Sequence, residues 1–291
     1  MSRPPSGALE RRTISVGGAN RTYWLAPQPA PEAPLLMVLH AMGINGPNMA
    51  AWTGLAVRGP AAGFATVFPD AVAEIWDDTG SGRVDGLDDA AFVSSVTRRL
   101  VAEGTAAPGA VFLAGLSNGA FFAERLARHG LVQASGLALV AGTARQTVLC
   151  IEGTKDPLLP YGGGRGSGMF GWMARRRARR QLVQSHGRVA VGAETLAGDW
   201  AAANGGPPRP TTEILSVAPG DLHVDRLTWA TPGHAPVVLY RIDGGGHGWP
   251  GGPQYMPALF VGRIAQSFDA TGILLEFALQ TVRAVPPTAS H

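Results

Sequence analysis

The stretch that decides the fold is VFLAGLSNGAFFAERLA, residues 111–127. It opens with a short apolar run, passes through Gly115-Leu116-Ser117-Asn118-Gly119, and continues as a segment with helical character. Gly-x-Ser-x-Gly between a strand and a helix is the pattern of a nucleophile elbow, a sharp turn that exposes a serine hydroxyl above a sheet. The glycines suit the turn because it leaves no room for larger side chains. The pattern predicts a strand–turn–helix unit with Ser117 as a nucleophile.

Similar apolar runs recur along the chain on both sides of this stretch. They are continuous rather than alternating, as is typical of strands buried on both faces of a parallel sheet. The expected strands cover residues 35–39, 65–68, 111–114, 137–140, 147–151 and 237–242, and the main expected helices cover residues 88–103 and 119–129. This alternation predicts an α/β fold with a mostly parallel central sheet and helices on both faces.

Length and composition favour one globular domain over residues 1–291. Apolar residues make up 45% of the chain, enough for a full core, and Gly plus Pro is 63 of 291, which is below the range of low-complexity disorder. The net charge is 24 − 21 = +3, too weak to indicate a nucleic-acid partner. The expected partner is a small-molecule or oligomeric substrate, and the oligomeric state is not predicted.

The single cysteine, Cys150, excludes an internal disulfide and is typical of a reducing compartment. The N-terminus shows no apolar core of a secretion signal, and no apolar run is long enough to cross a bilayer. A cytoplasmic location is therefore the default expectation, with secretion as the alternative if a signal peptide has been removed.

Residues 162–190 do not fit the alternation of strands and helices. They begin with GGGRGSGMFGW and continue into a basic run with five arginines between Arg175 and Arg180. We interpret the segment as a surface loop that leads into a solvated helix. The alternatives are a flap over the active site, or a patch for acidic partners or membrane surfaces.

A serine hydroxyl needs a neighbouring base, and this fold supplies its catalytic residues in the order Ser, acid, His. His247 lies in DGGGHGWP, directly after the expected strand at residues 237–242, where a flexible loop lets an imidazole reach the carboxyl edge of the sheet. Asp156 follows the expected strand at residues 147–151 in the same way. We predict His247 as the base and Asp156 as the acid that orients it. The competing residues, given less weight, are Asp199, Asp221, Asp225 and Asp243 for the acid and His186, His223 and His234 for the base.

An oxyanion hole needs two N–H donors that point at the charge of the transition state. The backbone N–H of Asn118 is the expected first donor, and that of Met42, in the loop after residues 35–39, is the expected second. The His40 side chain is expected to hold this loop in place. The chain carries no Cys/His cluster, P-loop or dinucleotide fingerprint, so we predict neither a metal nor a cofactor.

Two tryptophans lie near the predicted site. Trp76 follows the expected strand at residues 65–68 and either lines the acyl pocket or packs within its loop. Trp249 lies two residues after His247 and is expected to support the histidine loop, with a place beside the substrate as the alternative.

Together these motifs resemble the polyhydroxybutyrate depolymerase-type esterases of the α/β-hydrolase superfamily, a group related to feruloyl and acetyl xylan esterases. The resemblance spans roughly residues 22–277 and rests on VLHAMG, GRVDGLDDAAFV, GLSNGAFFAERLA, IEGTKDPLLPY, DWAAANGG and VVLYRIDGGGHGWPGG. It implies the α/β-hydrolase fold, a Ser117–His247–Asp156 triad and an oxyanion loop at residues 40–42. The sequence departs from the family at Ala41, where glycine is usual, and in lacking paired cysteines.

The resemblance implies a serine ester hydrolase that forms an acyl-enzyme on hydroxyalkanoate esters or short acyl and aromatic carboxylic esters. A peptidase or amidase with the same triad is one alternative. A non-catalytic α/β-hydrolase scaffold that binds a ligand or partner is the other.

Overall fold

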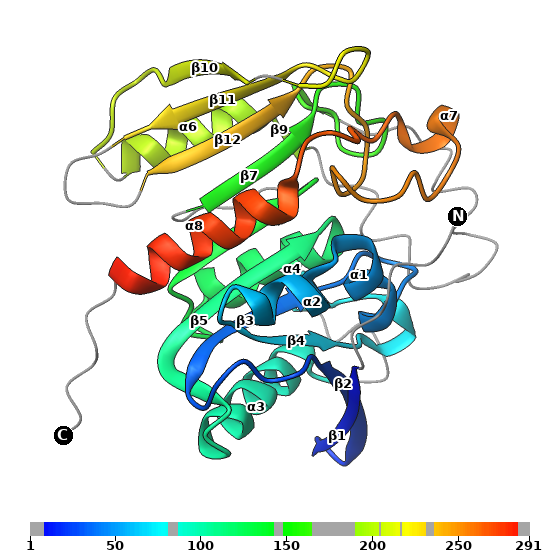
Figure 1. The fold of residues 1–291 in the computed structure, drawn as a ribbon, viewed down its shortest axis with the longest axis vertical. Helices are drawn as coiled ribbons and strands as arrows, with labels where there is room; N and C mark the ends of the chain where they lie inside the picture. Colours follow the sequence, from blue (N-terminus) through cyan, green and yellow to red (C-terminus); the bar gives the residue numbers. More distant parts are fainter. Residues whose placement is uncertain are drawn as a thin grey trace. The chain divides into compact units, whose positions relative to one another are not determined.

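The computed structural model describes residues 9–80, 87–142, 148–164, 190–203, 205–215, 217–230 and 236–284. The chain divides into two compact units (Figure 1). The first unit is Met1–Leu139 with Ala270–His291, and the second is Val140–Asp269. One domain over residues 1–291 stays a prediction.

The first unit is built around strands in the order β1-β2-β4-β3-β5-β6. Strands β3, β4 and β5 run parallel, whereas β2 pairs antiparallel with both β1 and β4. Its elements are β1 (Glu10–Val16), β2 (Ala19–Leu25), β3 (Ala33–Leu39), α1 (Gly46–Thr53), α2 (Leu55–Ala61), β4 (Ala65–Pro69), η1 (Val72–Glu74), α3 (Asp89–Ala102), β5 (Ala106–Leu116), α4 (Asn118–Arg128), β6 (Gly136–Val140) and α8 (Ala270–Ala284).

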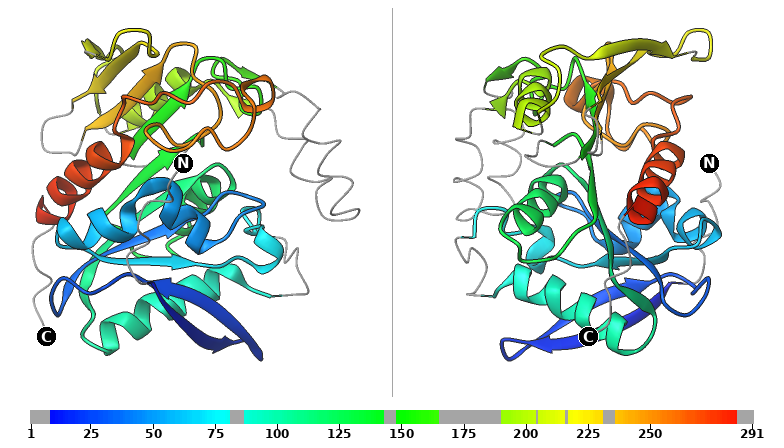
Figure 2. Two further views of the ribbon diagram at one scale, coloured as in Figure 1. Left: turned by 45° about the vertical axis from the view of Figure 1, so that its right-hand side comes forward. Right: turned by 90° about the vertical axis from the view of Figure 1, so that its left-hand side faces the viewer.

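Helices cover both faces of this part of the sheet (Figure 2, right). Helices α3 and α4 lie on one face, and α1, α2 and α8 lie on the other. Helix α3 shows why these segments form helices: Phe92, Val96 and Leu100 recur at helical spacing and are fully buried. Its first turn is capped by the Asp88 carboxylate, which accepts a hydrogen bond of 2.9 Å from the Ala91 amide. The predicted helices at residues 88–103 and 119–129 are thus confirmed as α3 and α4.

The second unit carries the strand order β7-β12-β11-β10, in which β7 and β12 are parallel and the other pairs are antiparallel. A separate two-stranded ribbon joins β8 to β9. The elements are β7 (Val148–Gly153), β8 (Gly163–Gly164), β9 (Ala190–Val191), α6 (Ala193–Ala203), β10 (Thr211–Leu215), β11 (Val224–Trp229), β12 (Val237–Ile242) and α7 (Ala258–Val261).

The six predicted strands correspond to β3, β4, β5, β6, β7 and β12. The antiparallel strands β1, β2, β10 and β11 were not predicted. Within the segment at residues 162–190, β8 and the start of β9 form a paired base, and residues 165–189, which include Arg175 to Arg180, lie outside the described residues. In the described part of the chain, no helix has both the length and the apolar character that a membrane span needs.

Candidate active site

Ser117 lies between β5 and α4 in a strained turn. Its backbone angles are φ 54° and ψ −118°, a conformation that a residue with a side chain adopts at a cost of about 1–3 kcal/mol. Both neighbours, Leu116 and Asn118, are buried, whereas Ser117 is half-buried. The turn therefore places the serine at the surface of the first unit and at the N-terminus of a helix, as the nucleophile-elbow pattern predicts.

The two glycines of the elbow are required by close backbone contacts. A Cβ atom on Gly115 would lie 2.4 Å from the carbonyl oxygen of Gly119. A Cβ atom on Gly119 would lie 2.3 Å from the carbonyl oxygen of Leu39, at the end of β3. The helix after the serine is thus pressed against the strand that leads into the predicted oxyanion loop.

The loop after β3 carries the predicted second oxyanion donor. Within the described residues, neither the Met42 amide nor the Asn118 amide has a hydrogen-bond acceptor. Gly43 has φ 82° and donates its amide to the Glu74 carbonyl at 2.9 Å. Ala41 does not have a positive φ, so alanine fits where the family usually has glycine.

His40, at the start of this loop, forms contacts through both ring nitrogens and does so as a neutral ring. It is fully buried, and its Nε2 atom accepts a hydrogen bond of 3.0 Å from the Ala71 amide. Its Nδ1 atom lies 2.8 Å from the Ala41 carbonyl oxygen and is therefore the protonated nitrogen. Burial lowers the pKa of His40 to about 4, with the Ala41 carbonyl and Asp70 acting in the opposite direction.

Trp76 packs within the first unit and has no exposed surface. Its indole N–H donates to the His40 carbonyl at 3.0 Å, and its ring stacks on Phe122 with centroids 4.9 Å apart. The Asn118 side chain accepts from the Trp76 amide at 2.8 Å and donates to the Trp76 carbonyl at 3.2 Å. Of the two expectations for Trp76, this geometry matches packing rather than an exposed pocket wall, and it links the elbow to the loop that begins at His40.

Asp156 and His247 lie together in the second unit. His247 Nδ1 is 2.7 Å from Asp156 Oδ2, and both side chains are buried. The other carboxylate oxygen accepts from the Leu158 and Leu159 amides at 2.7 and 2.9 Å. A carboxylate bonded to Nδ1–H fixes the neutral imidazole with Nε2 as its acceptor, the form that a general base requires.

The loop that follows β12 and carries His247, called the histidine loop below, contains glycines that let it pass close to neighbouring backbone. Gly244 has φ 74°, and a Cβ atom on Gly246 would lie 2.1 Å from the Val261 carbonyl oxygen. The His247 amide donates to that same oxygen at 2.5 Å, and the Tyr255 hydroxyl donates to the His247 carbonyl at 2.8 Å. Trp249, two residues after His247, is 2% exposed, and its supporting role stays a prediction.

Three of the competing aspartates bind other partners in the same unit. Asp221 accepts from the Ser267 amide and hydroxyl, both at 2.6 Å. Asp243 accepts from the Thr154 hydroxyl at 2.9 Å. Asp225 accepts from Arg241 at 2.6 Å and contacts His223 at 3.0 Å. His186 and His234 lie outside the described residues.

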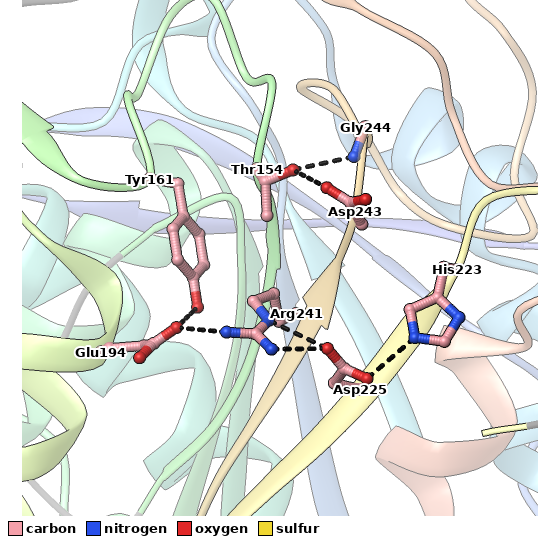
Figure 3. Close-up of polar contacts among 8 residues, drawn as sticks. All are labelled: Thr154, Tyr161, Glu194, His223, Asp225, Arg241, Asp243 and Gly244. Carbon is pink, nitrogen blue, oxygen red and sulfur yellow. Dashed lines mark hydrogen bonds and ion pairs between the residues drawn. The ribbon is translucent and has the colours of Figure 1, made fainter. Parts of the chain in front are cut away.

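A polar cluster around Arg241 was not predicted from the sequence (Figure 3). The Arg241 guanidinium on β12 binds Asp225 on β11 and also donates to Glu194 on α6 at 2.8 Å. Glu194 accepts in turn from the Tyr161 hydroxyl at 2.7 Å. The cluster ties the chain after Asp156 to the sheet, and among the described residues no group of His, Cys, Asp or Glu is placed to hold a metal ion.

No protein-family model matches the chain. It is similar to a protein named "Putative esterase NocK" from Nocardia uniformis subsp. tsuyamanensis, at 29% identity over 92% of this chain and 82% of that protein. Its structure is similar to that of the acetyl xylan esterase from Aspergillus awamori, with a TM-score of 0.56 and 12% identity over 83% of this chain and 94% of that one. This chain has the α/β-hydrolase fold. The fold prediction is thereby confirmed, and the strained turn at Ser117 lies between β5 and α4.

Proposed function

We propose that this chain is a serine carboxylic-ester hydrolase in which Ser117, His247 and Asp156 act as a triad. The observation that carries the proposal is the elbow at Ser117, because φ 54° at a serine between two sterically required glycines is strain that an ordinary turn does not need. The buried Asp156–His247 pair supplies the oriented base that such a serine requires. The similarity to a protein named as an esterase supports the same activity.

In the proposed reaction, Ser117 Oγ attacks the ester carbonyl carbon while His247 Nε2 takes the hydroxyl proton. The Met42 and Asn118 amides stabilise the oxyanion of the tetrahedral intermediate. His247 then protonates the leaving alcohol, and an acyl-enzyme forms on Ser117. In the second half, His247 takes a proton from water as the water oxygen attacks the acyl carbon. His247 then returns the proton to Ser117 Oγ as the bond between Oγ and the acyl carbon breaks, and the free acid leaves. Asp156 stabilises the imidazolium in both halves.

The substrate class follows from the resemblance to polyhydroxybutyrate depolymerase-type esterases. The proposed substrates are hydroxyalkanoate esters or short acyl and aromatic carboxylic esters, as small molecules or oligomers. Membership of that particular family is part of the proposal and rests on the motifs around Ser117, Asp156 and His247.

Labelling and point variants test the proposal together. A fluorophosphonate probe should modify Ser117, located by peptide mass spectrometry, and Ser117→Ala should abolish both labelling and hydrolysis of p-nitrophenyl esters. His247→Ala should lower kcat by roughly 10⁴-fold or more, and Asp156→Asn by a smaller factor, because the acid orients the base without accepting the proton. Ser94→Ala, on α3 of the same unit, is the matched control and should keep full activity.

Each alternative has its own signature in this experiment. Labelling of another serine, or of none, contradicts the triad and favours a binding scaffold. Turnover of peptide anilides in preference to matched esters favours a peptidase or amidase. Full activity in Asp156→Asn would show that another residue is the acid of the triad, and Asp225 would be the first residue to substitute.

A further inference from the structure

The loops that carry Asp156 and His247 are joined before either residue is reached. Figure 3 shows the contacts of Thr154 with Asp243 and Gly244 that join them. Strands β7 and β12 pair in parallel up to Gly153 and Ile242. Pairing then continues past the strand ends, since the Thr154 amide donates to the Ile242 carbonyl at 2.9 Å and the Lys155 amide donates to the Gly245 carbonyl at 2.8 Å. The acid loop and the histidine loop therefore leave the sheet as a pair.

The Thr154 hydroxyl closes this junction with two hydrogen bonds. It donates to Asp243 Oδ1 at 2.9 Å and accepts from the Gly244 amide at 2.8 Å. A hydroxyl can play both roles at once, which no aliphatic side chain of the same shape can do. Thr154, two positions before Asp156, therefore forms hydrogen bonds with two successive residues of the histidine loop, Asp243 and Gly244.

The backbones at this junction also touch without side chains between them. A Cβ atom on Gly153 would lie 2.4 Å from the carbonyl carbon of Gly245. On its other side, the histidine loop is held by the Gly246 amide, which donates to the Arg263 carbonyl at 2.8 Å. The histidine loop is therefore held by backbone contacts at Gly153 on one side and at Arg263 on the other.

We propose that the Thr154 hydroxyl is a positioning group that sets the register between Asp156 and His247. The inference rests on the proposed function, in which this pair is the acid and base of a triad. One residue separates Thr154 from Asp156, and two separate Gly244 from His247. A displacement at the Thr154 hydroxyl therefore changes the 2.7 Å hydrogen bond between the Asp156 carboxylate and the His247 imidazole. Errors of about 1 Å in a catalytic group can lower turnover by roughly 100-fold.

Thr154→Val removes both hydrogen bonds and keeps the shape of the side chain. It should lower kcat by roughly 10- to 100-fold with little change in KM. Thr154→Ser retains the hydroxyl and should recover most of the lost turnover. Thr212→Val, the same chemical change at an exposed position on β10, is the matched control and should match the wild type. Equal activity in Thr154→Val and Thr154→Ser would overturn the inference.

A double-variant cycle separates positioning from general stability. In the Asp156→Asn background the pair is already impaired, so Thr154→Val should cause little further loss of kcat. If Thr154→Val lowers kcat by the same factor in the wild type and in Asp156→Asn, Thr154 does not act through the Asp156–His247 pair. If Thr154→Val does not fold, Asp243→Ala removes one of the two hydrogen bonds of the Thr154 hydroxyl from an exposed position and should lower kcat by a smaller factor. Asp243→Asn, which keeps the acceptor oxygen, is its control.

Proton NMR gives a readout that does not depend on turnover. The His247 Nδ1–H signal, assigned by its loss in His247→Gln, should be present in the wild type and Thr154→Ser and weakened or lost in Thr154→Val. An unchanged signal in Thr154→Val would overturn the positioning role even if the chain proves to be an esterase. If the wild type hydrolyses no ester but Thr154→Val still loses the His247 signal, the proposed function is contradicted and the positioning role of Thr154 stands.

Discussion

Two regions supply the proposed chemistry, and they are held by different forces. The serine region, residues 39–46, 70–76 and 115–122, relies on buried neutral groups such as the His40 ring, the Trp76 indole and the Asn118 amide. The acid–histidine region, residues 152–161, 223–225, 241–249 and 261–263, relies on charged and half-exposed groups around Arg241 and Thr154. The comparison teaches that steric change and acid should destabilise the first region most, and that added salt should affect mainly the second, where the ion pairs of Arg241 are partly exposed.

The largest expected effect is steric, at Gly119 of the serine region. Gly119→Ala would place a Cβ atom 2.3 Å from the Leu39 carbonyl oxygen, so the elbow must move away from β3. We expect a loss of roughly 3 kcal/mol or more in the free energy of unfolding, together with loss of fluorophosphonate labelling. Urea denaturation measures the first effect and gel-based labelling the second.

Gly198→Ala is the matched control for this variant. Gly198 lies within α6, and a Cβ atom added there would have no neighbouring atom within 4 Å, so alanine should stabilise the helix by up to about 1 kcal/mol. Equal effects at Gly119 and Gly198 would contradict the steric account of the elbow.

The second expected effect is the response of the serine region to acid. Because the pKa of His40 is about 4 in the fold and its ordinary value is 6.5, only the unfolded chain binds this proton between those two pH values. Stability should therefore fall as pH drops from about 6.5 to about 4, by up to about 3 kcal/mol from this residue. Urea denaturation at several pH values in that window measures the slope.

His40→Gln isolates this contribution. Glutamine keeps an acceptor for the Ala71 amide but does not titrate, so the variant should lose less stability than the wild type over the same pH range. Identical slopes for the two proteins would mean that His40 does not couple the serine region to pH.

The smallest expected effect is electrostatic, at Arg241 of the acid–histidine region. Arg241→Met should lower the free energy of unfolding by about 1 kcal/mol, because the ion pairs with Asp225 and Glu194 are partly exposed. The difference from the wild type should shrink in 1 M salt, where exposed charges are screened. Arg226→Met is the control, since its 3.6 Å pair with Glu213 is exposed on both sides and should contribute almost nothing. A loss that is independent of salt would show that Arg241 acts through packing.

Strands β1 and β2 escaped prediction although the sequence contained a local signal for them. Gly17 and Gly18 form a two-residue turn with φ 58° and 81°, the geometry of a tight β-hairpin, and the flanking runs are β1 and β2. Their alternating burial differs from the continuous apolar runs of the central strands, so a search for buried parallel strands does not find them.

Strand β10 is mostly exposed and has no long apolar run, so it is identified only by its pairing with β11.

The predicted site also combines features that have a local sequence signal with features that depend on contacts between distant segments. Ser117 and the Asp156–His247 pair follow from motifs whose chemistry is local: a turn that needs two glycines, and polar residues that end two buried strands. The reciprocal hydrogen bonds between Asn118 and Trp76 could not be predicted, because they join residues 42 positions apart. The same holds for Thr154 and Asp243, which are 89 positions apart.

The order of residues alone determined which segments become buried strands and where the backbone must turn sharply. These properties depend on apolar runs and glycine, which act over a few neighbouring residues. The tertiary structure alone decided that His40 is neutral and that Trp76 supports a loop. Burial and hydrogen-bond partners set protonation and side-chain roles, and both arise only when distant segments pack together.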